Sequence, residues 1–123
     1  MTTTKKLTPP IRRAGPQKEI DKKEQANLAI PYFKRLLAKH PENMRKLFSR
    51  AIFDLGNRSQ LAVNSRQALV YVLGCNGFSH RATADCLGMN ESTCVYVFKR
   101  ANERYENDEK FHELCNEIAF GNE

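Results

Sequence analysis

The sequence predicts an all-α fold: a small helical domain of about five to six helices that contains a helix-turn-helix and follows a disordered basic N-terminal arm. Three observations support this prediction. The chain has 123 residues, of which 41% are hydrophobic, so it can form one small helical core. Apolar residues recur at three- and four-residue spacing in several segments, with helix-capping and helix-ending residues between them. Residues 1–22, in contrast, contain few large apolar side chains.

The predicted arm, residues 1–22, has too little apolar surface to offset the entropy lost on ordering, and it contains three prolines. Three roles remain open for it. It inserts into a DNA minor groove beside a helix-turn-helix, it is a solvated tail that keeps the protein soluble, or it binds an acidic protein partner. The basic residues of this arm are Lys5, Lys6, Arg12 and Arg13.

Residues 23–58 are predicted to form an N-terminal helical segment. Apolar residues recur at helical spacing over 23–39, but Pro31 interrupts them, so we expect a break near Ile30. Pro41 is well placed to begin the next helix. That helix has the clearest apolar stripe of the chain, formed by Met44, Leu47, Phe48, Ala51, Ile52 and Leu55.

Arg45, Lys46 and Arg50 lie off that stripe, on the face predicted to meet solvent. A basic helix face of this kind can hold the phosphate groups of a nucleic acid. These residues are therefore candidate phosphate contacts, although a charged and solvated helix face also occurs without any function.

A connector is predicted over residues 58–64, with one helical turn at 60–62 as an option. Ser65 is a candidate N-cap for a helix over 66–73. Because that stretch is rich in valine, a strand is the weaker alternative. The glycine-containing run 74–77 is predicted to end the element as a loop.

The stretch 78–104 has the pattern of a helix-turn-helix, with a short helix, a tight turn and a longer helix. Ser79 is a good N-cap for the first helix, and Gly88 supplies the permissive backbone that ends it. Met89 is expected to fill the corner between the helices, and Asn90 to cap the second helix. The second helix has a single apolar stripe, formed by Cys94, Val97, Phe98, Ala101 and Tyr105.

The opposite face of the second helix is polar. A recognition helix contacts base edges with its N-terminal residues and phosphates with its basic residues. Asn90, Ser92 and Thr93 have groups that hydrogen-bond to bases. Lys99 and Arg100 follow two turns later and are candidate phosphate contacts. The alternative is an amphipathic pair of helices that only packs.

Four groups of residues share the order and spacing of a known DNA-binding domain: Ser65-Arg66-Gln67-Ala68, Ser79, Gly88-Met89-Asn90-Glu91-Ser92-Thr93 and Lys99-Arg100. The pattern resembles the C-terminal domain of the bacterial replication initiator DnaA. That family has an Arg-Gln pair at the start of the preceding helix. It also has a Gly-Arg-Asp-His-Ser/Thr-Thr signature at the start of the recognition helix and an Arg-Lys pair further along.

This resemblance implies a Trp-repressor-like helix-turn-helix domain over 59–121 that binds double-stranded DNA. In that family the residue that matches Arg66 enters the minor groove. The residues that face the major groove match Asn90, Glu91, Ser92 and Thr93. This chain has Met89, Asn90 and Glu91 where the family has Arg, Asp and His, so the tip loses a cation and gains an anion. A Walker motif is absent, so the resemblance concerns the DNA-binding module and not the ATPase.

A last short amphipathic helix is predicted after Asn107-Asp108, with Glu109, Glu113 and Glu117 on its outer face. The charge is distributed unevenly along the chain. Residues 1–66 contain 15 Lys and Arg against 5 Asp and Glu, whereas residues 67–123 contain 5 against 9. Either the N-terminal half therefore supplies the phosphate contacts, or the helix-turn-helix binds a protein.

Binding is expected rather than catalysis, because no nucleophile–base pair, paired-carboxylate motif or phosphate-binding loop stands out. No cofactor is expected. No apolar run approaches the roughly 18 residues of a membrane span, and no signal peptide is visible. A cytoplasmic protein is therefore expected, either associated with the nucleoid or, for a phage-encoded protein, located in the host cytoplasm. The four cysteines, Cys75, Cys86, Cys94 and Cys115, are interpreted as reduced thiols, with a zinc site from Cys75, Cys86 and His112 as an open alternative.

The first functional hypothesis is a double-stranded DNA-binding protein, such as a small regulator or replication-associated factor of a bacterium or its phage. The alternative is a helical protein-interaction module, a phage adaptor or structural component, that binds a host or phage protein. A third hypothesis is binding of RNA or single strands, which requires exposed aromatic residues, and Tyr96 is the one residue placed for it. The oligomeric state stays open.

Overall fold

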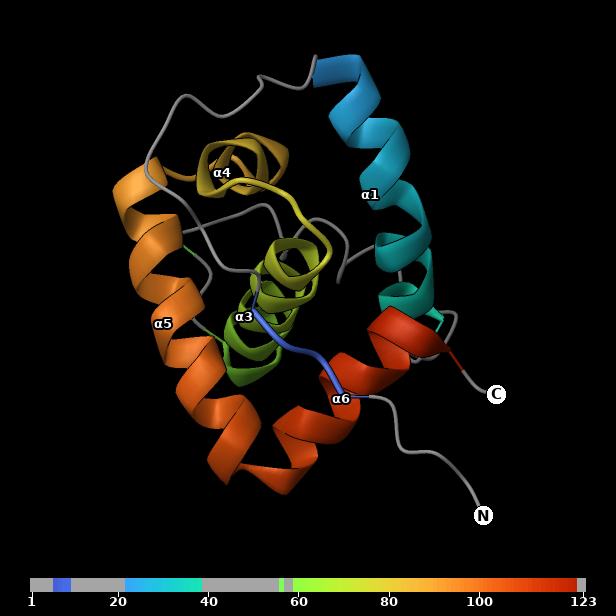
Figure 1. The fold of residues 1–123 in the computed structure, drawn as a ribbon, viewed down its shortest axis with the longest axis vertical. Helices are drawn as coiled ribbons and strands as arrows, with labels where there is room; N and C mark the ends of the chain where they lie inside the picture. The colour runs from blue at the N-terminus through green and yellow to red at the C-terminus, as the bar shows by residue number, and fades with distance from the viewer. Residues whose placement is uncertain (1–5, 10–21, 39–55, 57–58, 122–123) are drawn as a thin grey trace.

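The all-α prediction is confirmed in a computed structural model of the chain, which describes residues 6–9, 22–38, 56 and 59–121. The predicted helix with the Met44–Leu55 stripe lies outside these residues. Within the described part the chain forms five helices and no strand (Figure 1). The helices are α1 (Lys22–Leu37), α3 (Gln60–Cys75), α4 (His80–Leu87), α5 (Glu91–Asn107) and α6 (Glu109–Phe120).

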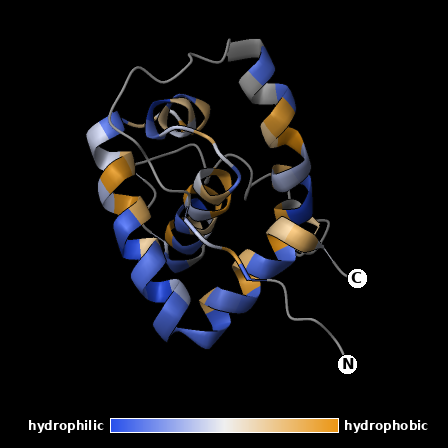
Figure 2. Cartoon of the chain, in the orientation of Figure 1, coloured by the Kyte–Doolittle hydropathy of each residue, from blue (hydrophilic) through white to orange (hydrophobic). Residues whose placement is uncertain are grey.

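Helix α3 is the centre of the fold. It packs against α5, α6, α1 and α4, and Figure 1 shows the other helices arranged around it. Every residue from Ala68 to Leu73 has an exposed fraction of 0%. A helix that is apolar on all sides is expected in this position, because it has no face to present to water. Hydrophilic residues instead lie along the outer sides of α5 and α6 (Figure 2).

The start of α3 differs from the prediction. The helix begins at Gln60, within the stretch that was predicted as a connector, and Ser59 is its N-cap. The Ser59 hydroxyl accepts a hydrogen bond from the backbone N–H of Ala62 at 3.3 Å. Ser65, the predicted cap, is instead buried inside the helix with an exposed fraction of 1%. The alternative of a strand over 66–73 is wrong, because the helix continues to Cys75.

The predicted break near Ile30 is also wrong, since α1 is continuous through Pro31. A proline inside a helix lacks the N–H that would bond to the carbonyl four residues earlier. Here Pro31 and Asn27 are both exposed, so water can solvate the carbonyl that is left without that bond. The opposite face of α1 is buried, with Ala29 and Leu36 both at 0% exposure.

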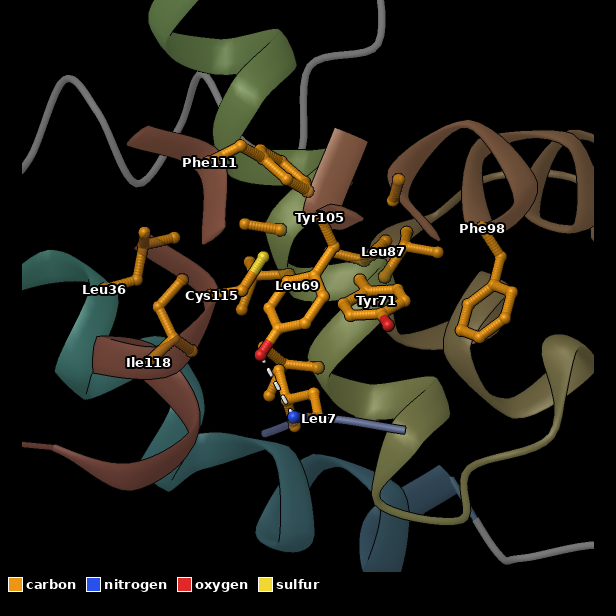
Figure 3. Packing of buried hydrophobic residues seen from close by; sticks show 14 of the residues in the cluster. Leu7, Leu36, Leu69, Tyr71, Leu87, Phe98, Tyr105, Phe111, Cys115 and Ile118 are labelled. Atoms are coloured by element: carbon orange, nitrogen blue, oxygen red, sulfur yellow. Dashed lines mark hydrogen bonds between the residues drawn. The ribbon is translucent and has the colours of Figure 1, made fainter. Parts of the chain in front are cut away.

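Aromatic rings form the middle of the core (Figure 3). The ring centroids of Tyr71 and Tyr105 are 4.9 Å apart, and those of Tyr71 and Phe98 are 5.5 Å apart. Phe98 approaches the backbone of α3 so closely that a Cβ added at Gly74 would lie 2.8 Å from its Cδ2 atom. This position therefore requires glycine for space rather than for conformational freedom.

A short N-terminal segment completes the core. Residues 6–9, which we call the strap, lie within the predicted disordered arm, yet Leu7 is buried with an exposed fraction of 5%. Its backbone N–H donates a hydrogen bond to the Tyr105 hydroxyl at 3.0 Å (Figure 3). Lys6 lies 3.3 Å from the carboxylate of Glu106. The predicted arm is therefore docked through Lys6 and Leu7, whereas Lys5, Arg12 and Arg13 lie outside the described residues.

Candidate nucleic-acid interface

The first helix of the predicted helix-turn-helix has the expected ends. The Ser79 hydroxyl accepts a hydrogen bond from the backbone N–H of Ala82 at 3.0 Å, which confirms Ser79 as the N-cap of α4. At the other end, Gly88 has a φ of 71°, in the left-handed region that glycine adopts without strain. The backbone N–H of Met89 then donates to the carbonyl of Ala84 at 3.0 Å, which closes the turn.

Helices α4 and α5 pack against each other through the predicted apolar faces. Ala84 and Leu87 of α4 are buried in the same core cluster as Cys94 and Phe98 of α5. Met89 is half-buried and packs against that cluster, as expected for a residue at the corner. The buried stripe of α5 is the predicted one, although its Val97 is only partly covered. Its burial fixes the rotation of α5, and therefore the face that meets solvent.

The tip of α5 is open to solvent. Asn90 occupies the N-cap position, but its side chain makes no capping hydrogen bond, so the amide group stays available to a ligand. This differs from the prediction of a side-chain cap, while the position itself is correct. All four residues predicted to read bases at the tip are exposed, namely Asn90, Glu91, Ser92 and Thr93.

The predicted phosphate contacts of α5 are exposed as well. Arg100 forms an ion pair with Glu103 at 3.6 Å, with both side chains more than half exposed. Such a pair is weak in water and does not prevent Arg100 from binding phosphate. Lys99 is exposed and forms no ion pair with the other described residues. The candidate contacts Arg45, Lys46 and Arg50 lie outside the part of the chain that the structure describes.

The position of Arg66 does not fit the role that the resemblance implies. Its exposed fraction is 9%, because it lies in the second turn of α3, the helix that the others surround. A residue that enters a minor groove must project from the surface by most of its length. Arg66 is therefore a residue of the interior in this conformation, and the candidate interface consists of residues from α5.

Arg104, a residue without a role predicted from the sequence, lies at the junction of three helices. Its guanidinium donates hydrogen bonds to Asn64 at 2.8 Å, to Gln67 at 2.7 Å and to Asp108 at 2.9 Å. It also lies over the ring of Phe111, 4.3 Å from the centroid. The Arg104 hydrogen bond, with that from the Phe111 backbone N–H, lowers the pKa of Asp108. This arginine turns inward and stabilises the fold rather than the surface of α5.

Tyr96 lies in the middle of the exposed face of α5, and 64% of it is exposed. Ser92 precedes it by four residues and Arg100 follows it by four, so the three share one side of the helix. Among the described residues it is the only large hydrophobic side chain exposed on α5, because the other two, Leu28 and Ile30, belong to α1.

The charge of the described C-terminal part is slightly negative. Residues 59–121 contain six Lys and Arg against eight Asp and Glu, a net charge of −2. The exposed carboxylates concentrate at the C-terminal half of α5 and on α6, at Glu103, Glu106, Glu109 and Glu113. The tip of α5 lies at the other end of that helix, next to α4 (Figure 1).

The thiols and histidines do not form a metal site in the described part of the chain. No group of three or more His, Cys, Asp or Glu residues there has the geometry to hold a metal ion, so the zinc alternative with Cys75, Cys86 and His112 has no support. His112 stacks on Tyr105, with the centroids 4.1 Å apart. All four cysteines are free thiols, and burial raises the pKa of Cys115 far above its ordinary value.

None of the helices within the described ranges has the length and apolar character that crossing a bilayer requires. Comparison with protein families, with curated proteins and with solved structures found no match. The resemblance to the DnaA domain therefore depends on the order and spacing of the quoted motifs alone.

Proposed function

We propose that this protein binds double-stranded DNA through α4 and α5, with α5 as the recognition helix. The observation that supports this proposal is the division of α5 into two faces. One face is buried against α3 and α4. The other face presents Asn90, whose side chain makes no capping hydrogen bond, the three residues that follow it, and the cations Lys99 and Arg100. A helix whose N-terminal end projects in this way is the geometry with which helix-turn-helix proteins enter the major groove.

The spacing along α5 suits a major groove. A helix rises about 1.5 Å per residue, so Lys99 lies about 13 Å along the axis from Asn90. The major groove of B-DNA is about 12 Å wide. With the tip of α5 at the base edges, the two cations are therefore near the phosphates that border the groove. In this pose Asn90 is suited to adenine and Glu91 to the amino group of cytosine.

The cations of α5 do not by themselves provide strong electrostatic attraction, because the described C-terminal part has a small negative charge. The surplus of basic residues lies in residues 1–66, which contain 15 Lys and Arg against 5 Asp and Glu. We expect that half to supply much of the salt-sensitive binding, and the tip of α5 to supply the sequence preference.

The test is a fluorescence-anisotropy titration of the full chain with random-sequence duplex DNA at two salt concentrations. The double variant Lys99→Ala/Arg100→Ala should weaken binding to every duplex. The slope of the logarithm of the binding constant against the logarithm of the salt concentration should decrease by about the amount expected for two lost phosphate contacts. The matched control is Lys110→Ala, which removes an exposed lysine from α6 and should leave binding unchanged. Equal binding by the double variant and the control would refute this docking.

A protein-interaction module is the second candidate. The observation in its favour is the pair of exposed apolar residues on α1, Leu28 at 47% and Ile30 at 41%, together with the acidic surface of α5 and α6. Exposed apolar side chains of this size are common at protein–protein contacts. Retention of one stoichiometric protein from nuclease-treated lysate, combined with no duplex binding at low salt, would favour this candidate over DNA binding.

A further inference from the structure

The polar residues at the tip of α5 leave one feature of its exposed face unexplained, the ring of Tyr96. This ring is 64% exposed although tyrosine has a large apolar surface, and it lies between the tip and the cations. Along the axis it is about 9 Å from Asn90 and about 5 Å from Lys99. On a recognition helix this position faces the interior of the groove rather than its phosphate border.

The chemistry of the major groove offers one partner for an apolar surface. The base edges there present hydrogen-bond donors and acceptors, which suit the amide and hydroxyl groups of the α5 tip. The exception is the C5-methyl group of thymine, which side chains recognise by apolar contact. Tyr96 is the only large apolar side chain that α5 exposes, so the complementary group on the DNA is this methyl.

We propose that Tyr96 contacts a thymine methyl group and gives the recognition helix a preference for thymine at one position of its site. The proposal depends on the proposed DNA-binding function. The surroundings of the ring support it, because Ser92, Lys99 and Arg100 are exposed around it and are complementary to base edges and phosphates rather than to an apolar protein surface.

The experiment first selects bound duplexes from a random pool with the full-length protein, and then replaces each thymine of the selected site by uracil. This replacement removes only the methyl group. We expect one position at which uracil weakens wild-type binding about fourfold, the effect of withdrawing one methyl-sized apolar contact. Tyr96→Ala should bind the thymine and uracil duplexes equally, whereas Tyr96→Phe should retain the discrimination because it keeps the ring.

Leu28→Ala is the matched control, since it removes another exposed apolar side chain that lies on α1, and it should discriminate thymine from uracil as the wild type does. Far-UV circular dichroism verifies that the Tyr96 variants are folded, which is expected for a side chain so exposed. Loss of discrimination in Tyr96→Ala alone supports the proposal.

Three results overturn the proposal, and they differ in what they say about the function. If the wild type does not bind any duplex, the DNA-binding function itself fails. If duplex binding occurs but Tyr96→Ala still discriminates thymine from uracil at the position where the wild type does, the function stands and the role of Tyr96 is wrong. If the wild type prefers single strands and Tyr96→Ala removes that preference, the ring is a stacking surface for unpaired bases.

Discussion

Replacement of Leu7 by alanine should destabilise the protein by less than about 1 kcal/mol, much less than replacement of an equally buried leucine within a helix. Burial of the Leu7 side chain contributes about 2 kcal/mol, and its N–H bond to Tyr105 contributes about 1 kcal/mol. The exposed pair of Lys6 and Glu106 adds at most about 0.5 kcal/mol. Ordering the four residues of the strap costs about 1 kcal/mol each or slightly less, Pro9 being restricted already. These terms nearly cancel.

The near cancellation sets the size of the effect. Within the described residues the strap is held by these contacts, so Leu7→Ala releases it instead of leaving a cavity. The loss cannot then exceed the small free energy that favours docking. Leu69, in contrast, is held inside α3 and cannot leave, so Leu69→Ala should cost about 2–5 kcal/mol. Lys6→Ala, which removes only an exposed ion pair, should change stability by less than about 0.5 kcal/mol.

The assay is urea unfolding of the four proteins, followed by circular dichroism of the helices and analysed with a common slope. Hydrogen exchange of the Leu7 amide provides a local measurement, since protection there reports docking of the strap directly. If Leu7→Ala costs as much as Leu69→Ala, the strap is an integral part of the core and the entropy argument is wrong. If the Leu7 amide exchanges freely in the wild type, the strap is not docked in solution.

Four further predictions concern the core and the hydrogen bonds of Arg104. Gly74→Ala should destabilise the protein by about 1–3 kcal/mol, although this change usually stabilises a helix, because the new Cβ meets the ring of Phe98. Thermal unfolding measures the loss, and adding Phe98→Leu should recover part of it. A gain in stability from Gly74→Ala would contradict the close approach of Phe98 to α3. Arg104→Lys should cost about 1–2 kcal/mol in urea unfolding, since the single nitrogen of an ammonium group cannot replace the planar fork whose two nitrogens reach Asn64, Gln67 and Asp108 together. The hydrogen bond from Arg104 lowers the pKa of Asp108, so this bond stabilises the fold above the ordinary carboxyl pKa, and the stabilisation is lost as the pH falls through the lower pKa of the folded state. An Asp108→Asn variant should lack this part of the dependence of stability on pH. If the variant and the wild type lose stability in acid in the same way, the bond makes no such contribution. Cys115 should react with an aromatic disulfide reagent only as fast as the protein unfolds, because the thiol is fully buried and its pKa is raised; rapid labelling of the native protein would show that the core opens there.

The helix-turn-helix was the part of the fold that the sequence predicted best. Its signals are local, because Ser79 caps α4 by accepting a hydrogen bond from the backbone N–H of Ala82, three residues later, and Gly88 ends that helix through its own backbone conformation. The buried stripe of α5 follows from spacing alone. With the stripe fixed, the exposure of the tip residues follows as well, so the candidate interface could be placed before any contact was known.

Three of the errors concern features that depend on distant residues. The first turns of α3 contain polar side chains and were predicted as a connector, but Asn64 and Gln67 find a partner in Arg104, about forty residues later. Leu7 is a single apolar residue in a polar stretch, and it is buried in a core cluster of residues that are distant in sequence, including its hydrogen-bond partner Tyr105. Arg66 was assigned to a minor groove by the resemblance alone, and no local pattern indicates that α3 is central and buries this arginine.

The packing of α6 has a consequence for the order in which the protein can be completed during synthesis. Helix α6 follows the other four helices along the chain, yet it packs against α1, α3 and α5. The strap and α1 therefore leave the ribosome well before the elements that bury them. Until α6 emerges, the apolar sides of α1 and α3 are only partly covered and are open to premature association. A chain that stalls before Glu109 should therefore depend on chaperones, although its helix-turn-helix has already been translated.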